Sequence, residues 1–66
     1  MDVGNIVYSI ELSDGTMSVN YHKILHKIGI HGESPMRMMY IMQDGKSFMD
    51  NELYTDFEKA LDECLK

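Results

Sequence analysis

Three histidines, at positions 22, 26 and 31, are the residues with the clearest potential for chemistry in this chain. His22 and His26 lie four residues apart, which on a helix would let two imidazoles reach one metal ion, with His31 as a third ligand. Lys23 and Lys27 interleave the pair and would repel a divalent cation, and the segment contains no carboxylate. We therefore interpret the histidines as the solvated face of a short helix, with a metal site and a pH-sensitive interface as the alternatives.

No nucleophile in the sequence is accompanied by an evident base. Cys64 falls on the apolar side of the predicted C-terminal helix, near the end where the helix dipole opposes thiolate formation. The serines lack a G-x-S-x-G motif, and there is no phosphate-binding or dinucleotide-binding motif. Asp14 and Asp44 each precede a glycine and are explained as turn residues. The sequence thus predicts a protein that is not an enzyme and uses no cofactor.

The first half of the chain predicts a hairpin followed by a helix. Residues 6–12 alternate with the period of a strand, Asp14-Gly15 has the composition of a tight turn, and the alternation resumes at Met17. From Asn20 to Gly29 the apolar residues recur at helical spacing. This segment is therefore predicted to be a short helix that Gly29 ends.

The second half predicts the same order again. Residues 36–42 alternate, Asp44-Gly45 marks a second turn, and a return strand begins at Ser47. The last helix is predicted to begin at Asp50 or at Thr55, where Thr-Asp-Phe-Glu has the form of a capping box.

These elements predict a single α+β domain over residues 1–66 with the order ββα-ββα. The expected architecture is a four-stranded antiparallel sheet with two helices packed on one face. The residues expected to be mostly buried are Ile6, Ile10, Leu25, Ile28, Met38, Tyr40, Phe57 and Leu61. The third strand is apolar on both sides, so its second face, with Met39 and Ile41, is expected to be covered by a partner or by a second copy.

Charge and composition narrow the function further. Eleven acidic against six basic residues give a net charge of −5, which argues against non-specific nucleic-acid binding and fits a partner with a basic surface. The single cysteine forbids an intrachain disulfide, the N-terminus does not have the pattern of a signal peptide, and no apolar run is long enough to span a bilayer. These features favour a cytoplasmic protein without membrane contact.

The predicted function is that of a small acidic protein-binding module that acts without turnover, as an inhibitor or an adaptor. A homodimer that meets through Met39 and Ile41 is also expected. The alternative is a metal-binding or nucleic-acid-binding regulator that uses the His/Lys segment 20–31. The residues predicted to bind the partner are Arg37, Met39, Ile41, Tyr54, Asp56, Glu58, Asp62 and Glu63.

The end of the chain, a predicted strand followed by TDFEKALDECL, resembles the strand-then-helix half of HicB-like antitoxins. The resemblance does not extend to the order of the other elements, and it assigns no role to any residue. In size and charge the chain is also similar to accessory proteins of phages and mobile elements, several of which inhibit a host enzyme. That similarity is what implies an inhibitor or an adaptor.

Overall fold

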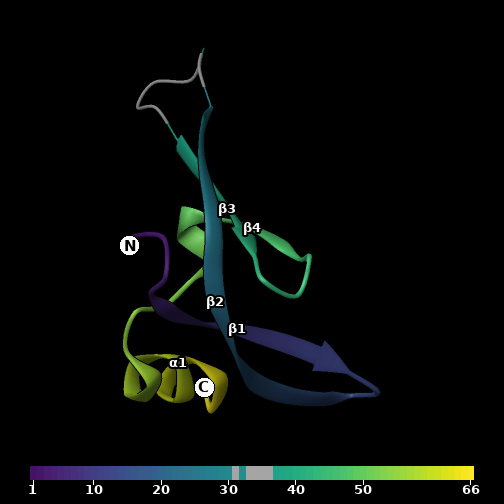
Figure 1. The fold of residues 1–66 in the computed structure, drawn as a ribbon. Helices are drawn as coiled ribbons and strands as arrows, with labels where there is room; N and C mark the ends of the chain where they lie inside the picture. Colours follow the sequence, from purple (N-terminus) through teal and green to yellow (C-terminus); the bar gives the residue numbers. More distant parts are fainter. Residues whose placement is uncertain (31, 33–36) are drawn as a thin grey trace.

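The computed structural model describes residues 1–30, 32 and 37–66. Its elements are the strands β1 (Ile6–Ser13), β2 (Thr16–Ile30), β3 (Arg37–Met42) and β4 (Ser47–Met49), the 3₁₀ helix η1 (Asp50–Glu52) and the helix α1 (Phe57–Cys64). The four strands form one antiparallel sheet in the order β1-β2-β3-β4, which curls around a long and bent β2 (Figure 1). The prediction of a four-stranded antiparallel sheet in an α+β fold is confirmed.

The helix predicted for residues 20–29 is wrong, because this segment continues β2. Up to Lys23 it pairs with β1, and from Ile24 onward it pairs with β3. A register shift between Ile24 and His26 changes which residues face each side of the sheet. That shift breaks the two-residue alternation and produces an apolar spacing that resembles a helix. The order ββα-ββα and the second helix are therefore not present in the described residues.

Both predicted hairpin turns are confirmed. Asp14 (φ 52°) and Gly15 (φ 75°) both have positive φ between the paired residues Ser13 and Thr16, as a two-residue turn of type I′ requires. Gly45 (φ 93°) lies in the turn between β3 and β4. Residue 36, the first of the predicted third strand, lies outside the described residues.

The C-terminal helix is shorter than its apolar pattern suggested. Asp56 is its N-cap, and the Asp56 side chain accepts a hydrogen bond of 2.9 Å from the backbone N–H of Glu58. The capping box expected from Thr55 is therefore replaced by an aspartate cap one residue later. The helix runs for two turns and ends at Cys64.

The chain that follows β4 returns to β1 and links the two ends of the sheet. Tyr54 pairs with Tyr8 through two backbone hydrogen bonds of 2.8 and 2.9 Å. After this bridge α1 packs against β1 and β2, with the ring of Phe57 edge-on to the ring of Tyr8 at a centroid distance of 5.5 Å. We call the side of the sheet enclosed by the curl the inner face and the opposite side the outer face.

The inner face forms most of the core; on β3 it is the face that the sequence predicted, and on β1 it is the opposite one. The buried apolar residues are Val7, Ile24, Tyr40, Met42, Leu53 and Ala60. Of the residues expected in the core, Tyr40 is confirmed, and Met38 and Ile10 are half-buried. The expectation is wrong for five residues that are exposed, namely Ile6, Leu25, Ile28, Phe57 and Leu61. The curl encloses the Val7 side of β1, which places the Ile6 side outside.

No helix among the described residues combines the length and the apolar character that crossing a membrane requires.

Candidate functional site

A hydrogen-bonded chain of three polar side chains links β1, β2 and the turn between β3 and β4. Ser9 Oγ lies 2.8 Å from His22 Nε2, and His22 Nδ1 lies 3.0 Å from Asp44 Oδ2. The His22 side chain is only 2% exposed, whereas that of Asp44 is 48% exposed. The chain of hydrogen bonds thus runs from the interior of the protein to its surface.

The sheet register accounts for this placement. Val7 pairs with His22 and Ser9 pairs with Asn20, so Ser9 and His22 are diagonal neighbours on the inner face. The ring of Phe48, on β4, lies against the imidazole at a centroid distance of 5.0 Å. The backbone N–H of Lys46 donates to Asp44 Oδ1 at 3.0 Å and fixes the orientation of that carboxylate.

The protonation states follow from the chemistry of the groups. The Lys46 N–H, and after it the bond from His22, hold the pKa of Asp44 below its ordinary value despite partial desolvation, so this carboxylate is ionised at neutral pH. An ionised carboxylate only accepts hydrogen bonds, so His22 Nδ1 carries the proton. In the neutral ring Nε2 then accepts from the Ser9 hydroxyl. This is the order of groups found in a Ser-His-Asp triad.

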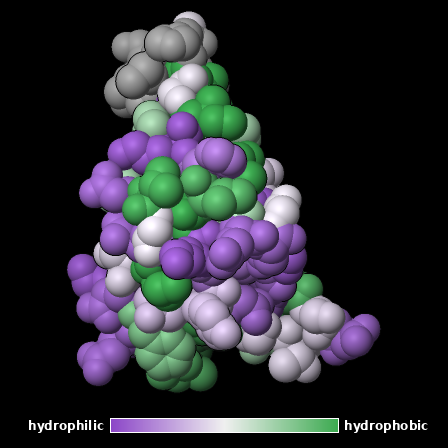
Figure 2. Space-filling view, in the orientation of Figure 1, coloured by the Kyte–Doolittle hydropathy of each residue, from purple (hydrophilic) through white to green (hydrophobic). Residues whose placement is uncertain are grey.

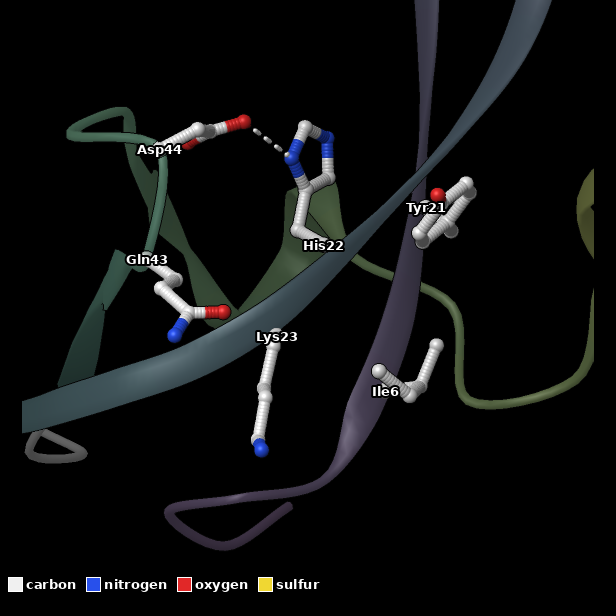
Figure 3. Close-up of a pocket in the computed structure, with 6 residues that line it drawn as sticks. All are labelled: Ile6, Tyr21, His22, Lys23, Gln43 and Asp44. Atoms are coloured by element: carbon white, nitrogen blue, oxygen red, sulfur yellow. Dashed lines mark hydrogen bonds and ion pairs between the residues drawn. The ribbon is translucent and has the colours of Figure 1, made fainter.

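The triad geometry is not accompanied by an accessible nucleophile. Among the described residues, an open groove of about 460 Å³ lies beside the site. Its lining residues are Ile6, Tyr21, His22, Lys23, Gln43 and Asp44 (Figure 3). Ser9 is 1% exposed and does not line this groove. The groove therefore reaches the exposed carboxylate of Asp44, while the hydroxyl that would attack a substrate stays inside.

The sequence concealed this arrangement because its members are far apart and each had a simpler explanation. Asp44 was explained by its turn, and it does also cap that turn through Lys46. The sequence predicts His22 on the solvated face of a helix, and Ser9 alternates with Ile10, which is expected to be buried. The signal available in the sequence was a serine and a histidine within two strands of one hairpin, which becomes informative only once the register is known.

His22 and His26, the two histidines that the structure describes, do not form a common site. His22 faces inward, whereas His26 is exposed beyond the register shift and pairs with Ile41. His31 lies outside the described residues. A metal site was suggested by the four-residue spacing of His22 and His26 on a helix, but this segment is a strand. In the part of the chain that the structure describes, no group of three or more histidine, cysteine, aspartate or glutamate side chains could hold a metal ion.

The residues predicted to bind a partner fall into two groups. Arg37, Met39 and Ile41 lie on β3, and Arg37 Nη2 forms an ion pair of 3.2 Å with Asp50 Oδ1. The other five are all C-terminal to η1. Tyr54 lies in the bridge to β1 and Asp56 caps α1, while Glu58, Asp62 and Glu63 lie on that helix.

The β3 group belongs to an apolar surface that spans three strands. Met39 pairs with Ile28 on β2 and with Met49 on β4, so the three side chains form one row on the outer face. Ile41 lies two residues along β3 on the same face. Ile28 is 45% exposed, and the other three residues are half-buried. We call these four residues the outer methionine surface, and Figure 2 shows apolar side chains gathered over this part of β2, β3 and β4.

Comparisons with protein families, with curated proteins and with solved structures found no match for this chain.

Proposed function

We propose that the protein is a binding module for another protein and acts without turnover, through the outer methionine surface. The observation that carries this proposal is the uncharged row Ile28–Met39–Met49, which crosses three neighbouring strands on the side of the sheet opposite the core. Methionine side chains are flexible and polarisable, so they adapt to the shape of a partner. Methionine is also enriched in the centres of protein interfaces.

Charge favours a partner with a basic surface. The net charge of −5 gives the whole molecule a negative field that speeds association with a positive protein. Near the outer methionine surface, η1 contacts β3 and carries Asp50 and Glu52 in its single turn. A partner that places an apolar side chain on Met39 would thus meet the carboxylate of Glu52 and the Arg37–Asp50 ion pair at the rim. An inhibitor or adaptor that works in the cytoplasm is the form of this function that we propose.

The alternatives receive less support from the described geometry. A basic face for nucleic acid would need the positive groups of residues 20–30 to be free, but Lys27 Nζ lies 3.0 Å from Asp2 Oδ1 and His22 is buried. A gel shift at low salt tests nucleic-acid binding. A zinc titration tests metal binding, because a metal that binds the folded state must raise the melting temperature.

The test of the proposal is affinity capture from the native host with matched baits. Wild-type protein and the variants Met39→Asp, Ile28→Glu and Leu12→Asp are immobilised, and bound proteins are identified by mass spectrometry. We expect a partner that the wild type and Leu12→Asp retain and that the two variants of the outer methionine surface lose. Leu12 is the control because it is apolar and 69% exposed but lies on β1, near the hairpin tip.

Two outcomes would contradict the proposal. One is a set of captured proteins that Met39→Asp and Ile28→Glu retain as well as the wild type does, while circular dichroism shows both variants folded. The other is a second copy of this chain as the occupant, as in the homodimer predicted through Met39 and Ile41. In that case Met39→Asp shifts a dimer to monomer in sedimentation velocity, and no other partner competes.

A further inference from the structure

The groove beside Asp44 lies along the edge of β2, at the point where β3 leaves that strand. The N–H of Gln43 donates to the C=O of Lys23 at 2.9 Å, and the chain then turns through Asp44 into β4. Figure 3 shows Asp44 and Gln43 on one side of the β2 ribbon, and Tyr21, Lys23 and Ile6 on the other. The groove therefore runs between two sets of side chains that differ in chemistry.

The backbone of Tyr21 adds an unpaired carbonyl at this edge. The N–H and C=O of Tyr8 are both bonded to Tyr54, so they point away from β2. Tyr21 is directly opposite Tyr8, which makes them a non-hydrogen-bonded pair, and the Tyr21 C=O therefore points away from β1. It points the same way as the Lys23 C=O, which meets Gln43. Among the described residues β3 reaches no further along β2 than Lys23, so the Tyr21 carbonyl has no backbone partner there.

Asp44 presents a carboxylate whose orientation and charge are fixed. The Lys46 N–H lies 3.0 Å from Oδ1, and His22 Nδ1 lies 3.0 Å from Oδ2. The Lys46 N–H, and after it the bond from His22, lower the pKa of Asp44 more than partial desolvation raises it. Each carboxylate oxygen keeps a further lone pair, and the side chain is 48% exposed. The groove thus holds an anionic hydrogen-bond acceptor that is already in place.

The opposite side of the groove is aromatic and apolar. The side chain of Tyr21 is 74% exposed and that of Ile6 is 46% exposed. They are diagonal neighbours on the outer face, because Ile6 pairs with Lys23 two residues along β2. A planar cation stacks favourably on the face of such a ring. Lys23 is exposed as well, and its flexible stem allows the ammonium group to remain in water.

We propose that the groove binds the guanidinium group of an arginine side chain that a protein partner presents. A guanidinium is planar and has five N–H donors and no acceptor. Its donors complement the Asp44 carboxylate and the Tyr21 carbonyl, and its plane complements the Tyr21 ring. An ammonium group lacks that plane, and a carboxylate ligand would meet the like charge of Asp44. The groove volume of about 460 Å³ is within the usual range of ligand sites.

The inference rests on the proposed function only in naming a protein as the source of the arginine. The groove contains no residue of the outer methionine surface. A small-molecule titration therefore tests the groove without the partner. The net charge of −5 favours the same kind of partner, because a basic surface carries arginine side chains.

The first test is a titration of the wild type with capped amino acids, followed by NMR of the backbone amides at constant chloride concentration. The probes are N-acetyl-arginine amide, its neutral isostere N-acetyl-citrulline amide, and N-acetyl-lysine amide. We expect capped arginine to shift the amides of Tyr21, Lys23 and Gln43 in a saturable way, with a dissociation constant of about 10 mM or less. Capped lysine should bind at least about threefold more weakly, and capped citrulline should not saturate.

The second test repeats the arginine titration on variants of the groove. Asp44→Asn removes the anionic charge and should raise the dissociation constant by about fivefold or more. Tyr21→Leu removes the ring but keeps an apolar side chain, and should raise it by about twofold to fivefold. Lys23→Met removes a charge of the same sign as the ligand and should lower it by about twofold.

The matched control is Asp14→Asn, which makes the same change of charge in the other Asp-Gly turn, outside the groove. It should leave the dissociation constant within about twofold of the wild type. The amide spectrum of each variant before titration shows whether the variant is folded. Tyr21→Leu and Lys23→Met change exposed side chains, so they test the groove even if Asp44→Asn is unstable.

Four results would overturn the inference. Capped arginine that causes no saturable shift in the groove amides up to about 50 mM would remove it. So would citrulline binding as tightly as arginine, or an Asp14→Asn variant that loses as much affinity as Asp44→Asn. Weaker arginine binding by Lys23→Met would show that the ammonium group does not oppose the ligand, as it must if the ligand is a cation.

The groove and the proposed function can fail separately. A captured partner that Met39→Asp loses, combined with no arginine binding, would end this inference and support the proposed function. Saturable arginine binding without any captured protein would support the guanidinium site and overturn its assignment to a protein partner.

Discussion

The two faces of β1 differ in composition and in burial, and the more apolar face is the more exposed one. The outer face carries Ile6, Tyr8, Ile10 and Leu12, and the inner face carries Val7, Ser9 and Glu11. Yet Val7 and Ser9 are at most 1% exposed, while Ile6 is 46% exposed and Leu12 is 69% exposed. Apolar content therefore does not decide which face of this strand becomes the interior.

The difference shows that polar side chains can be buried inside the sheet when they form hydrogen bonds with one another. The curl of the sheet and the bridge between Tyr54 and Tyr8 shield the inner face from solvent but not the outer face. Ser9 and His22 can lie there because each is a hydrogen-bond partner of the other, and Asp44 takes the remaining ring nitrogen. The outer face, which is not enclosed, keeps its apolar residues available for α1, for a partner or for a second copy.

The largest loss of stability is expected from truncating an isoleucine on the inner face, compared with an isoleucine on the outer face. Ile24 is 1% exposed in the core, so Ile24→Ala should lower the free energy of unfolding by about 2 to 5 kcal/mol. Ile6→Ala is the matched control, and its loss should stay below about 1 kcal/mol, because the side chain is already half in water. Urea unfolding followed by circular dichroism measures both. Equal losses would mean that the Ile6 side of β1 is enclosed after all.

A smaller effect is expected from removing the hydroxyl at the inner end of the hydrogen-bonded chain. Ser9→Ala leaves His22 Nε2 buried without its partner, which should cost about 1 to 3 kcal/mol. Ser18→Ala, on the same hairpin but exposed, should change stability by about 0.5 kcal/mol or less. Thermal unfolding of both variants separates the two cases. If Ser9→Ala were neutral, the hydrogen bond to His22 would not contribute to stability.

The smallest expected effect is the contribution of Asp44 to the pH dependence of the free energy of unfolding. Its folded pKa lies below the ordinary value of 3.8, first because of the Lys46 N–H and then because of His22. A depressed carboxylate pKa adds stability that is complete above pH 3.8 and is lost as the pH falls through the folded pKa. Asp44→Asn should therefore be less stable than the wild type at neutral pH, and the difference should shrink on acidification below that value.

Urea titrations of wild type and Asp44→Asn from neutral pH to about pH 2 measure this difference. A gap that stays constant over the whole range would show that the ionised carboxylate is not the stabilising form. If the stability difference between the two proteins widened on acidification, its pH dependence would have the opposite sign to the one expected. That result would contradict the hydrogen bond from His22 to an ionised Asp44.

The local features of the chain were readable from the sequence. Asp14-Gly15 and Asp44-Gly45 specify tight turns by their positive-φ tolerance, residues 6–12 alternate as a strand, and the last apolar stripe forms a helix. Each of these depends on the neighbours of a residue in sequence. The alternation along β3 also predicted that Met39 and Ile41 lie on the face opposite Tyr40, and the register confirms this placement.

Only the tertiary structure decided which faces are inside and which residues meet. Residues 20–29 have a helical spacing, but pairing with β1 and then with β3 holds them as a strand, because two ladders of hydrogen bonds outweigh a weak local preference. The Ser9–His22–Asp44 chain joins residues that are far apart along the chain and depends on that register. Burial was misassigned on β1 for the same reason: the curl of the sheet is a property of all four strands together, and no single strand encodes it.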